Sequence, residues 1–298
     1  MMNSLKDIVE ESQRQKTKIL AVAASEDKEV LKSVVTAAEL NIIQPILIGD
    51  IFETKRIAVE IGLNIEGYEK VNTKDLKESA KIAVKLVSEG KADFVMKGLI
   101  DTSILLKEVL NKDYGLRTDS LLSHVMFYEI PTYHKLLVIT DGGMNITPSI
   151  NEKVSIIENA VQAFDNLGYK KINVACLAAK EKVNPKMSAT IDAEEIKKMW
   201  EKKNIQNVIV EGPLALDLAV SKESAKIKGF NSSIAGETDV LLVPNIEMGN
   251  GIGKSLTYFA NAKSAGVIMG AKAPIILVSR ADDQQTKLNS IALGSVIA

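Results

Sequence analysis

Short apolar runs alternate with amphipathic segments along almost the whole chain. Continuous apolar runs are typical of buried strands, and apolar residues spaced three and four apart indicate one face of a helix. We expect strands at residues 19–24, 45–49, 92–96, 136–139, 172–177, 208–210, 240–243 and 275–278. We expect helices over residues 30–38, 76–87, 102 onward, 149–168, 192–200 and 254–265.

Three helix ends are indicated by local chemistry. Ser149 and Glu152 have the spacing of a capping box, in which each side chain accepts the other residue's free amide. Asp192 and Glu195 resemble a second helix start. Gly168 is placed to end the helix that begins at Ser149.

Strands that alternate with helices predict an α/β protein with parallel sheets covered by helices on both faces. The strand runs are apolar throughout, as in strands buried on both sides. A chain of 298 residues is long enough for one large domain or two ordinary ones. The polar stretch Gly115–Ser120 is a candidate boundary.

The amino-acid composition excludes several classes of binding partner and site. The chain has 37 basic and 38 acidic residues, 46% hydrophobic residues and only 4% aromatic residues. It therefore lacks the basic excess and the stacking platforms of a typical nucleic-acid-binding protein. A single cysteine, Cys176, and two histidines, His124 and His134, exclude an internal disulfide and an HExxH zinc site. The apolar runs are far shorter than a membrane span of about 18 residues, and the polar start lacks a secretory core, so we expect a cytoplasmic protein.

Candidate ligand-binding residues follow the predicted strands, because open α/β sheets bind ligands beyond the carboxyl ends of their strands. The corresponding loops are Ser25, Lys97–Gly98, Asp141–Gly143, Glu211–Pro213, Asn245–Lys254 and Ser279–Asp283.

The segment Asn245–Ser255 is predicted to be a glycine-rich loop between a strand and a helix. It ends in Gly253-Lys254-Ser255, but Met248 occupies the place of the first glycine of a P-loop, so that motif fails. Exposed amides before a helix can still bind an anion. A simple tight turn is the alternative.

Ser279, Arg280 and Asp282 combine three useful chemistries at one predicted strand end. Arginine offers a planar fork of donors for phosphate, serine can donate to a developing negative charge, and a carboxylate can act as a base. A solvated strand end with a surface ion pair is an equally good explanation.

Lys97 and Lys107 flank the expected start of a helix near Thr102 and are candidate phosphate ligands. Lys107 is better explained than Lys97 as a solvated helix charge, because Lys97 directly follows a buried strand. Asp141 with its two glycines fits a functional loop and a turn equally well.

Other polar residues have structural explanations. Asp217 lies in an apolar stretch and needs a partner if it is buried, so we expect a capping role. His124 is expected to be a packed or hydrogen-bonded residue, and Cys176 to be an inert core thiol.

Taken together and in order, these loops resemble the phosphate acetyltransferase and phosphate butyryltransferase family, with details most like its butyryl members. The segments that carry the resemblance are Met96–Gly98 with Thr102, Thr140–Asn145, Val210–Asp217, Asp239–Gly253, Val278–Asp282 and Lys287–Ala292.

The resemblance implies two parallel-sheet α/β domains of the isocitrate and isopropylmalate dehydrogenase type with a cleft between them. It places residues 1–117 and 266–298 in the first domain and 118–265 in the second. It implies that butyryl-CoA or a similar short-chain acyl-CoA reacts with phosphate to give acyl phosphate and CoA. It further implies no permanently bound cofactor, no metal, and a homodimer or higher homo-oligomer.

The implied mechanism is direct attack of the CoA thiolate on the acyl phosphate in a ternary complex. The resemblance assigns Ser279 to the reacting carbonyl or thiol and Arg280 to phosphate. Thr286 stands where the acetyl enzymes have a catalytic aspartate, so Asp282, with Asp283 behind it, is the predicted base. The remaining predicted substrate and phosphate contacts are Lys97, Gly98, Thr102, Lys107, Asp141, Gly249 and Asn250.

Two alternatives remain open at this point. A metal-dependent hydroxyacid dehydrogenase on the same fold would bind a nicotinamide cofactor and a divalent metal. A catalytically silent acyl-CoA or acyl phosphate sensor would bind the same ligands without turnover.

Overall fold

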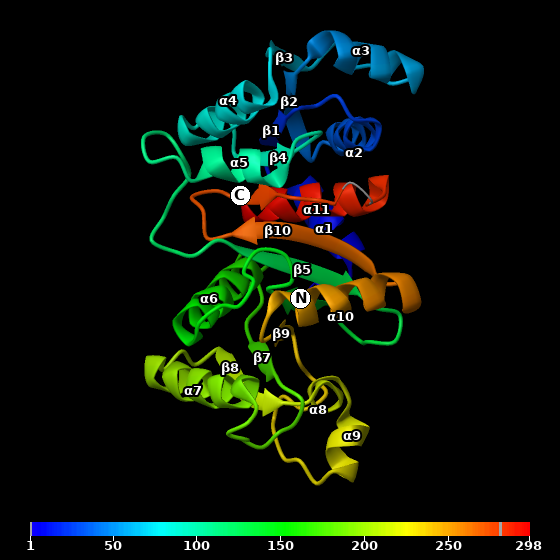
Figure 1. Ribbon diagram of the computed structural model, residues 1–298. Helices are drawn as coiled ribbons and strands as arrows, with labels where there is room; N and C mark the ends of the chain where they lie inside the picture. Colours follow the sequence, from blue (N-terminus) through cyan, green and yellow to red (C-terminus); the bar gives the residue numbers. More distant parts are fainter. Residues whose placement is uncertain (1, 280–281) are drawn as a thin grey trace. The chain divides into compact units, whose positions relative to one another are not determined.

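The computed structural model describes residues 2–279 and 282–298, in two compact units. The terminal unit comprises Leu5–Ser120 and Ala265–Ala298. The central unit comprises Leu121–Ser264 together with the first residues of the chain up to Ser4. Each unit has its own strands and covering helices (Figure 1).

The strands of the terminal unit run parallel, except that β10 is antiparallel to β11. Their spatial order is β3 (Glu69–Asn72), β2 (Ile43–Gly49), β1 (Lys18–Ala23), β4 (Phe94–Lys97), β11 (Ile275–Ile276) and β10 (Lys263–Met269).

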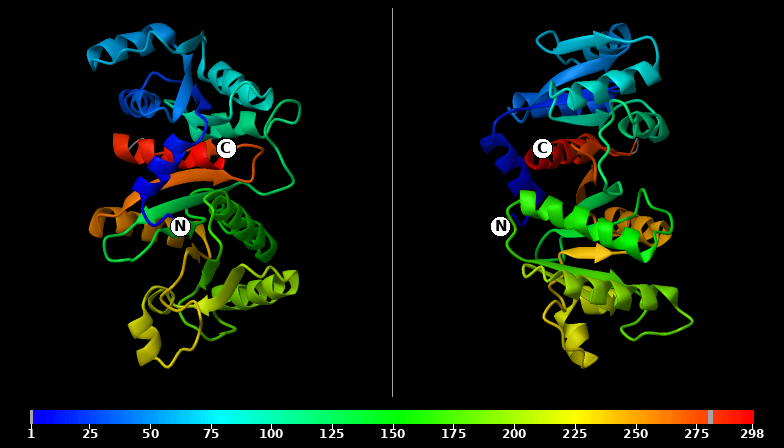
Figure 2. Two further views of the ribbon diagram at one scale, coloured as in Figure 1. Left: turned by 180° about the vertical axis from the view of Figure 1, so that it is seen from behind. Right: turned by 90° about the vertical axis from the view of Figure 1, so that its left-hand side faces the viewer.

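The helices of the terminal unit are α1 (Leu5–Arg14), α2 (Lys28–Glu39), α3 (Ile51–Glu60), α4 (Leu76–Ser88), α5 (Thr102–Val109) and α11 (Gln284–Ile297). The first and last helices, α1 in blue and α11 in red, pack against each other (Figures 1 and 2). The C-terminal segment therefore contributes to the same core as the N-terminal strands.

The central unit has the same kind of mixed sheet. Its strand order is β5 (Ser123–Glu129), β6 (Leu137–Thr140), β9 (Val240–Leu242), β7 (Ile172–Leu177) and β8 (Val208–Leu214). The β5 strand is antiparallel to β6, and the other pairs are parallel.

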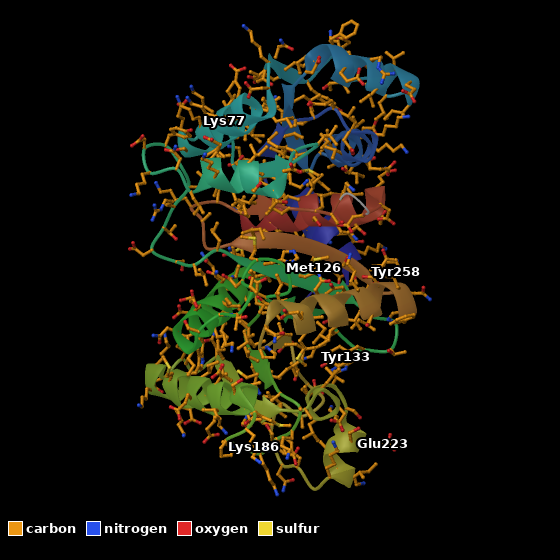
Figure 3. All side chains as sticks on the ribbon, viewed as in Figure 1. Lys77, Met126, Tyr133, Lys186, Glu223 and Tyr258 are labelled. Atoms are coloured by element: carbon orange, nitrogen blue, oxygen red, sulfur yellow. The ribbon has the colours of Figure 1, made fainter. Side chains whose placement is uncertain are left out.

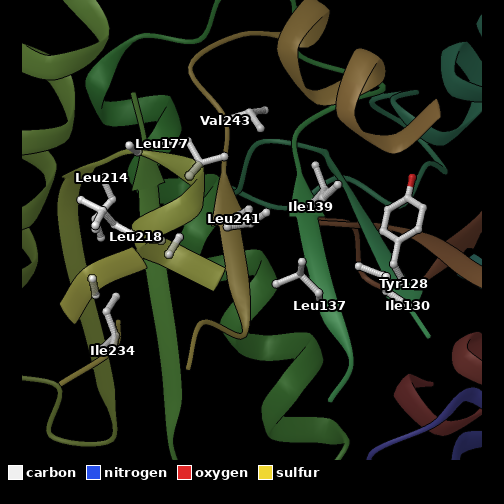
Figure 4. Packing of buried hydrophobic residues seen from close by; sticks show 14 of the residues in the cluster. Tyr128, Ile130, Leu137, Ile139, Leu177, Leu214, Leu218, Ile234, Leu241 and Val243 are labelled. Carbon is white, nitrogen blue, oxygen red and sulfur yellow. The ribbon is translucent and has the colours of Figure 1, made fainter. Parts of the chain in front are cut away.

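The helices of the central unit are α6 (Ile150–Asn166), α7 (Ser188–Lys203), α8 (Leu216–Val220), α9 (Lys222–Ile227) and α10 (Ile246–Phe259). One apolar cluster joins β5, β6, β9 and β7 to α8, with Leu137, Leu241 and Leu218 buried within it (Figure 4). Charged side chains such as Lys77 on α4 and Glu223 on α9 are exposed on the outer faces of their helices (Figure 3). This is the division of apolar and polar positions on which the α/β prediction depended.

Two of the three predicted helix ends are confirmed. Ser149 and Glu152 form a complete capping box at the start of α6, and Gly168 follows the end of that helix with φ +76°. The start predicted at Asp192 is wrong, because α7 already begins at Ser188. The Asp192 side chain instead accepts a 2.6 Å hydrogen bond from Lys153.

Two expectations about the architecture need correction. The sheets are mixed rather than purely parallel, because β5 and β10 run antiparallel to a neighbour. The segment Asn245–Ser255 is not a loop, since α10 begins at Ile246 with Asn245 as its N-cap. The expected helix at 254–265 is therefore the end of α10, and the strand β10 follows it.

Candidate active site

Two of the predicted loops lie at neighbouring strand ends in the terminal unit. The β4 and β11 strands are parallel, with Ile276 opposite Met96. Lys97–Gly98 and Ser279 therefore follow the carboxyl ends of adjacent strands, where an open α/β sheet binds its ligands. The end of β1 is next to β4 on the other side, with Ala23 opposite Lys97.

Gly98 is at a position where only glycine fits. Its amide donates a 2.8 Å hydrogen bond to the Ala23 carbonyl, and the Leu99 amide donates a 2.7 Å bond to the Ala24 carbonyl. A Cβ on Gly98 would lie 1.9 Å from the Ala24 carbonyl oxygen. The glycine thus allows the loop to pack directly on the end of β1.

The ammonium of Lys97 is buried rather than presented to solvent. Only 6% of the residue is exposed, and its Nζ donates to the carbonyls of Gly98 at 3.3 Å and Ile100 at 2.9 Å. These bonds hold the chain between β4 and α5. A phosphate contact from Lys97 therefore stays a prediction.

The N-terminus of α5 is exposed close to this loop. Thr102 is its first residue, and its N-cap residue Asp101 makes no capping bond to the helix with its side chain. Lys107 lies in the last turn of α5, not at its start as we expected, and is exposed. At 100° per residue it is about 140° around the helix from Thr102.

The loop after β11 brings Ser279 and Asp282 together. The Ser279 amide donates a 2.8 Å hydrogen bond to Asp282 Oδ2, and the Asp282 amide donates a 3.2 Å bond to the Ser279 carbonyl. Ser279 is exposed and Asp282 is half-buried. Arg280, the predicted phosphate ligand, lies outside the described residues.

In the central unit the buried carboxylate of Asp141 organises the loop after β6. Its Oδ1 accepts the amides of Gly143 and Met144, both at 2.8 Å, and its Oδ2 accepts Asn145 Nδ2 at 2.6 Å and the His124 amide at 3.1 Å. Four donors satisfy this carboxylate, and only 2% of Asp141 is exposed. Its geometry is that of a residue that shapes the loop.

Three of the predicted residues meet where this loop approaches α10. A Cβ on Gly249 would lie 2.7 Å from the Cα of Gly142, and a Cβ on Gly142 would lie 2.8 Å from the carbonyl carbon of Gly249. Asn250 Nδ2 donates a 3.5 Å bond to the Gly142 carbonyl. The loop after β6 and the first turns of α10 thus form one closely packed element.

Two other predicted residues have structural roles. Cys176 is buried in β7, and burial raises the pKa of its thiol to about 12, so it is inert at neutral pH as expected. Asp217 is not buried, and its carboxylate pairs with Lys228 at 2.7 Å on the surface. The hydrogen bond from Lys228 lowers the pKa of Asp217.

Sequence analysis missed two charged residues close to the strand ends of the terminal unit. Glu26, after β1, has a buried Oε2 for which the described residues offer no hydrogen-bond partner, and burial raises its pKa. Lys287 on α11 is 2% exposed and donates to the carbonyl of Ser279. Lys287 already belonged to a segment that carries the family resemblance, Lys287–Ala292, and that membership was the available signal.

Over residues 2–279 and 282–298, no group of three or more histidine, cysteine, aspartate or glutamate side chains is arranged to hold a metal ion. Over the same residues, no helix has the length and apolar character needed to cross a bilayer.

Fold and candidate site together define an α/β protein whose candidate ligand-binding loops lie at the carboxyl ends of parallel strands. The chain belongs to the phosphate acetyl/butaryl transferase family, whose model matches residues 4–85 and 73–295. The family that the ordered set of loops predicted is therefore confirmed.

Individual relatives cover almost the whole chain. A phosphate butyryltransferase of Clostridium acetobutylicum is 42% identical over 298 residues, covering 100% of this chain and 99% of its own. A phosphate acetyltransferase of Thermotoga maritima is 41% identical, covering 97% and 98%. The crystal structure of a branched-chain phosphotransacylase from Enterococcus faecalis V583 has a TM-score of 0.85 at 34% identity, covering 94% of this chain and 99% of its own.

Proposed function

We propose that this protein is a phosphate acyltransferase. It interconverts butyryl-CoA, or a similar short-chain acyl-CoA, and phosphate with acyl phosphate and CoA. The observation that carries the proposal is the 42% identity with a phosphate butyryltransferase over the full length of both chains. Coenzyme A is a substrate in this proposal and not a resident cofactor.

The reaction proceeds by direct transfer between two bound substrates. In the direction of CoA acylation, a base removes the thiol proton, and the thiolate attacks the carbonyl carbon of the acyl phosphate. A carbon–sulfur bond forms, the carbon–oxygen bond to phosphate breaks, and phosphate leaves with the electron pair. The thiolate is the required nucleophile, and the pKa of a free thiol is only about 8.5, so a nearby base is sufficient.

Ser279 and Asp282 supply the reacting groups of the terminal unit. The exposed Ser279 hydroxyl donates to the developing negative charge on the carbonyl oxygen or steadies the thiol. The Asp282 carboxylate is the base, and the bond from the Ser279 amide to its Oδ2 keeps the two residues together. Arg280 is the proposed phosphate ligand between them in sequence.

The helix N-terminus at Thr102 is the second proposed anion contact. Backbone amides at the start of a helix favour a phosphate group, whereas Lys107, in the last turn and about 140° around the helix from Thr102, is not assigned to this contact. Lys97 and Gly98 act by fixing the chain that leads into α5, as their contacts with Ile100 and Ala24 indicate.

In the central unit, Gly249 and Asn250 are the proposed substrate contacts. Asn250 is exposed beside the close contact of Gly142 with Gly249, whereas Gly249 is buried and supports the contact by letting α10 lie directly on Gly142. Asp141 supports them by fixing the loop conformation.

The butyryl preference is the finer part of the proposal. The relatives include proteins named for butyryl, acetyl and branched-chain groups at 34–42% identity. These groups differ by a few methylenes, each worth only about 1–3 kcal/mol in an apolar pocket.

The test is to mix the purified protein with phosphate and butyryl-CoA and to follow free thiol. Acetyl-CoA and isovaleryl-CoA are run in parallel, and Ser279→Ala, which should retain only a low residual rate, is the control. We expect thiol release that requires phosphate and is fastest with butyryl-CoA. Silence with all three substrates from a folded protein that still binds CoA would contradict the proposal and favour a sensor.

A further inference from the structure

The lysine at position 287 is buried in a place that is electrostatically unfavourable. It is the fourth residue of α11, after the N-cap residue Asp283, and only 2% of it is exposed. Burial penalises an ammonium group, and a positive charge near a helix N-terminus opposes the helix dipole. Among the described residues, the partners of its ammonium are backbone carbonyls rather than carboxylates. Such a residue needs a compensating set of contacts.

Those contacts all belong to the loop that carries the proposed reacting groups. Lys287 Nζ donates to the Ser279 carbonyl at 3.4 Å and to the Asp282 carbonyl. The same Ser279 carbonyl also accepts the Asp282 amide, and the Ser279 amide donates to the Asp282 carboxylate. Ser279 and Asp282 are thus bonded to each other and both are bonded to one buried ammonium.

A similar arrangement occurs at the next strand end. Lys97 is also buried, and its ammonium donates to the carbonyls of Gly98 and Ile100. Ammonium groups suit this task because three rotatable donors on a flexible stem can satisfy carbonyls that face different directions. The loops at two adjacent strand ends, those of β4 and β11, are therefore each held by hydrogen bonds from a buried lysine ammonium.

We propose that Lys287 is a positioning residue for acyl transfer, acting through Ser279 and Asp282. This inference rests on the proposed function. Its ammonium fixes the carbonyls of both residues, so that the serine hydroxyl and the aspartate carboxylate keep a constant separation and orientation. A displacement of about 1 Å in reacting groups can cost about 100-fold in rate, so the loss of this anchor is measurable.

The test compares Lys287→Met, Lys287→Arg and the combination of Lys287→Met with Ser279→Ala. Lys287→Met keeps the apolar stem but removes the donors, and we expect kcat to fall about 10- to 100-fold with the KM for acyl-CoA within about threefold. Lys287→Arg, which keeps a charged donor, should recover part of the lost kcat. Lys32→Met, which removes a partly exposed lysine of α2 that pairs with Glu29 in the same unit, is the control and should match the wild-type rate.

The double variant separates this proposal from the proposed function. Because Lys287 acts in part through the Ser279 hydroxyl, Lys287→Met should lower the residual rate of Ser279→Ala by a smaller factor than it lowers the wild-type rate, the remainder being its effect on Asp282. Multiplicative losses, or a folded Lys287→Met with wild-type kcat, would overturn the positioning role. An unchanged rate for Ser279→Ala alone would instead overturn the assignment of Ser279 in the proposed function.

A second measurement does not depend on activity. Hydrogen–deuterium exchange should become faster in Lys287→Met at the amides of Ser279 and Asp282, while the amides of Gly98 and Leu99 remain protected. Unchanged exchange at Ser279 and Asp282 would contradict the proposal. If Lys287→Met does not fold, Lys287→Gln is measured in its place with the same expected results.

Discussion

The packing of α10 on the loop after β6 makes a precise prediction for two glycines of one helix. Gly249 and Gly251 both lie inside α10, and neither has a positive φ. A Cβ on Gly249 would lie 2.7 Å from the Cα of Gly142 and 2.9 Å from Val243 Cγ2, whereas a Cβ on Gly251 would meet nothing within 4 Å. Substituting alanine at each position therefore compares a site where the added methyl group clashes with a site where it meets nothing.

The two substitutions should change the stability of the protein in opposite directions. Alanine is favoured over glycine in a helix by about 1 kcal/mol, so Gly251→Ala should stabilise the protein by up to that amount. Gly249→Ala gains the same helix propensity but forces two backbone segments apart by about 1 Å from normal contact at about 3.5–4.0 Å. Overpacking of this kind costs about 1–3 kcal/mol, and rigid backbone on the other side puts the cost at the upper end. The two variants should differ by about 3 kcal/mol.

The assay is urea unfolding followed by the fluorescence of Trp200. This is the only tryptophan of the chain, and it lies on α7 in the same central unit as Gly249. With a slope of about 2 kcal/mol per molar urea, the midpoints of Gly249→Ala and Gly251→Ala should differ by about 1.5 M. Equal midpoints for the two variants would refute the close approach of Gly249 to Gly142.

Three further results are expected. Burial raises the pKa of Cys176 to about 12, so its thiol should resist iodoacetamide at pH 8 in the native protein and react in urea, as read by mass spectrometry; native labelling would contradict this. Asp192→Ala should lower the free energy of unfolding by about 3 kcal/mol, because it leaves the buried ammonium of Lys153 without its 2.6 Å partner; a loss below 1 kcal/mol in urea unfolding would be that of a surface pair. A hydrogen bond from Lys222 is the main cause that lowers the pKa of Glu237 from 4.5 to about 2, so ionised Glu237 stabilises the fold above pH 4.5 and this contribution is lost as the pH falls towards 2. The melting temperature of Glu237→Gln should therefore be lower than that of the wild type at pH 7 and equal to it near pH 2. A difference in melting temperature that does not change with pH would count against the pKa shift.

The strands that sequence analysis found are those with continuous apolar runs. Residues 19–24 and 172–177 are fully apolar or nearly so, and they correspond to β1 and β7. The β3 strand has the sequence Glu-Lys-Val-Asn and lies at the edge of the sheet, so it has no apolar run that would predict a strand. The strands β5 and β10 were not predicted, and their antiparallel direction depends on long-range pairing, which periodicity does not encode.

The glycine-rich start of α10 was misread for a physical reason. Glycine disfavours helix interiors, and Gly249, Gly251 and Gly253 therefore indicated a loop. Gly249 packs on Gly142, and Gly253 packs on Tyr128, whose hydroxyl oxygen would lie 2.4 Å from an added Cβ. Tertiary contacts thus explain two of the three glycines, and they are invisible in the chain order.

The candidate site was predictable as a set of loops but not as a set of contacts. The rule that ligands bind at strand ends correctly grouped Lys97–Gly98 with Ser279, because β4 and β11 are neighbours. The direction of the Lys97 ammonium, into carbonyls of its own loop, depends on the local turn. The contact of Lys287 with the loop after β11 depends on where α11 packs, and only the folded chain shows this position.

The most direct test of the account measures the ratio of free thiol to acyl phosphate that the reaction produces. Butyryl-CoA and phosphate are mixed with the purified protein, free thiol is followed by absorbance, and acyl phosphate is followed by ³¹P nuclear magnetic resonance. The account predicts that thiol and acyl phosphate appear in equal amounts and that Ser279→Ala slows the formation of both by the same large factor. Thiol release without acyl phosphate would show a hydrolase, and that result would contradict acyl transfer to phosphate.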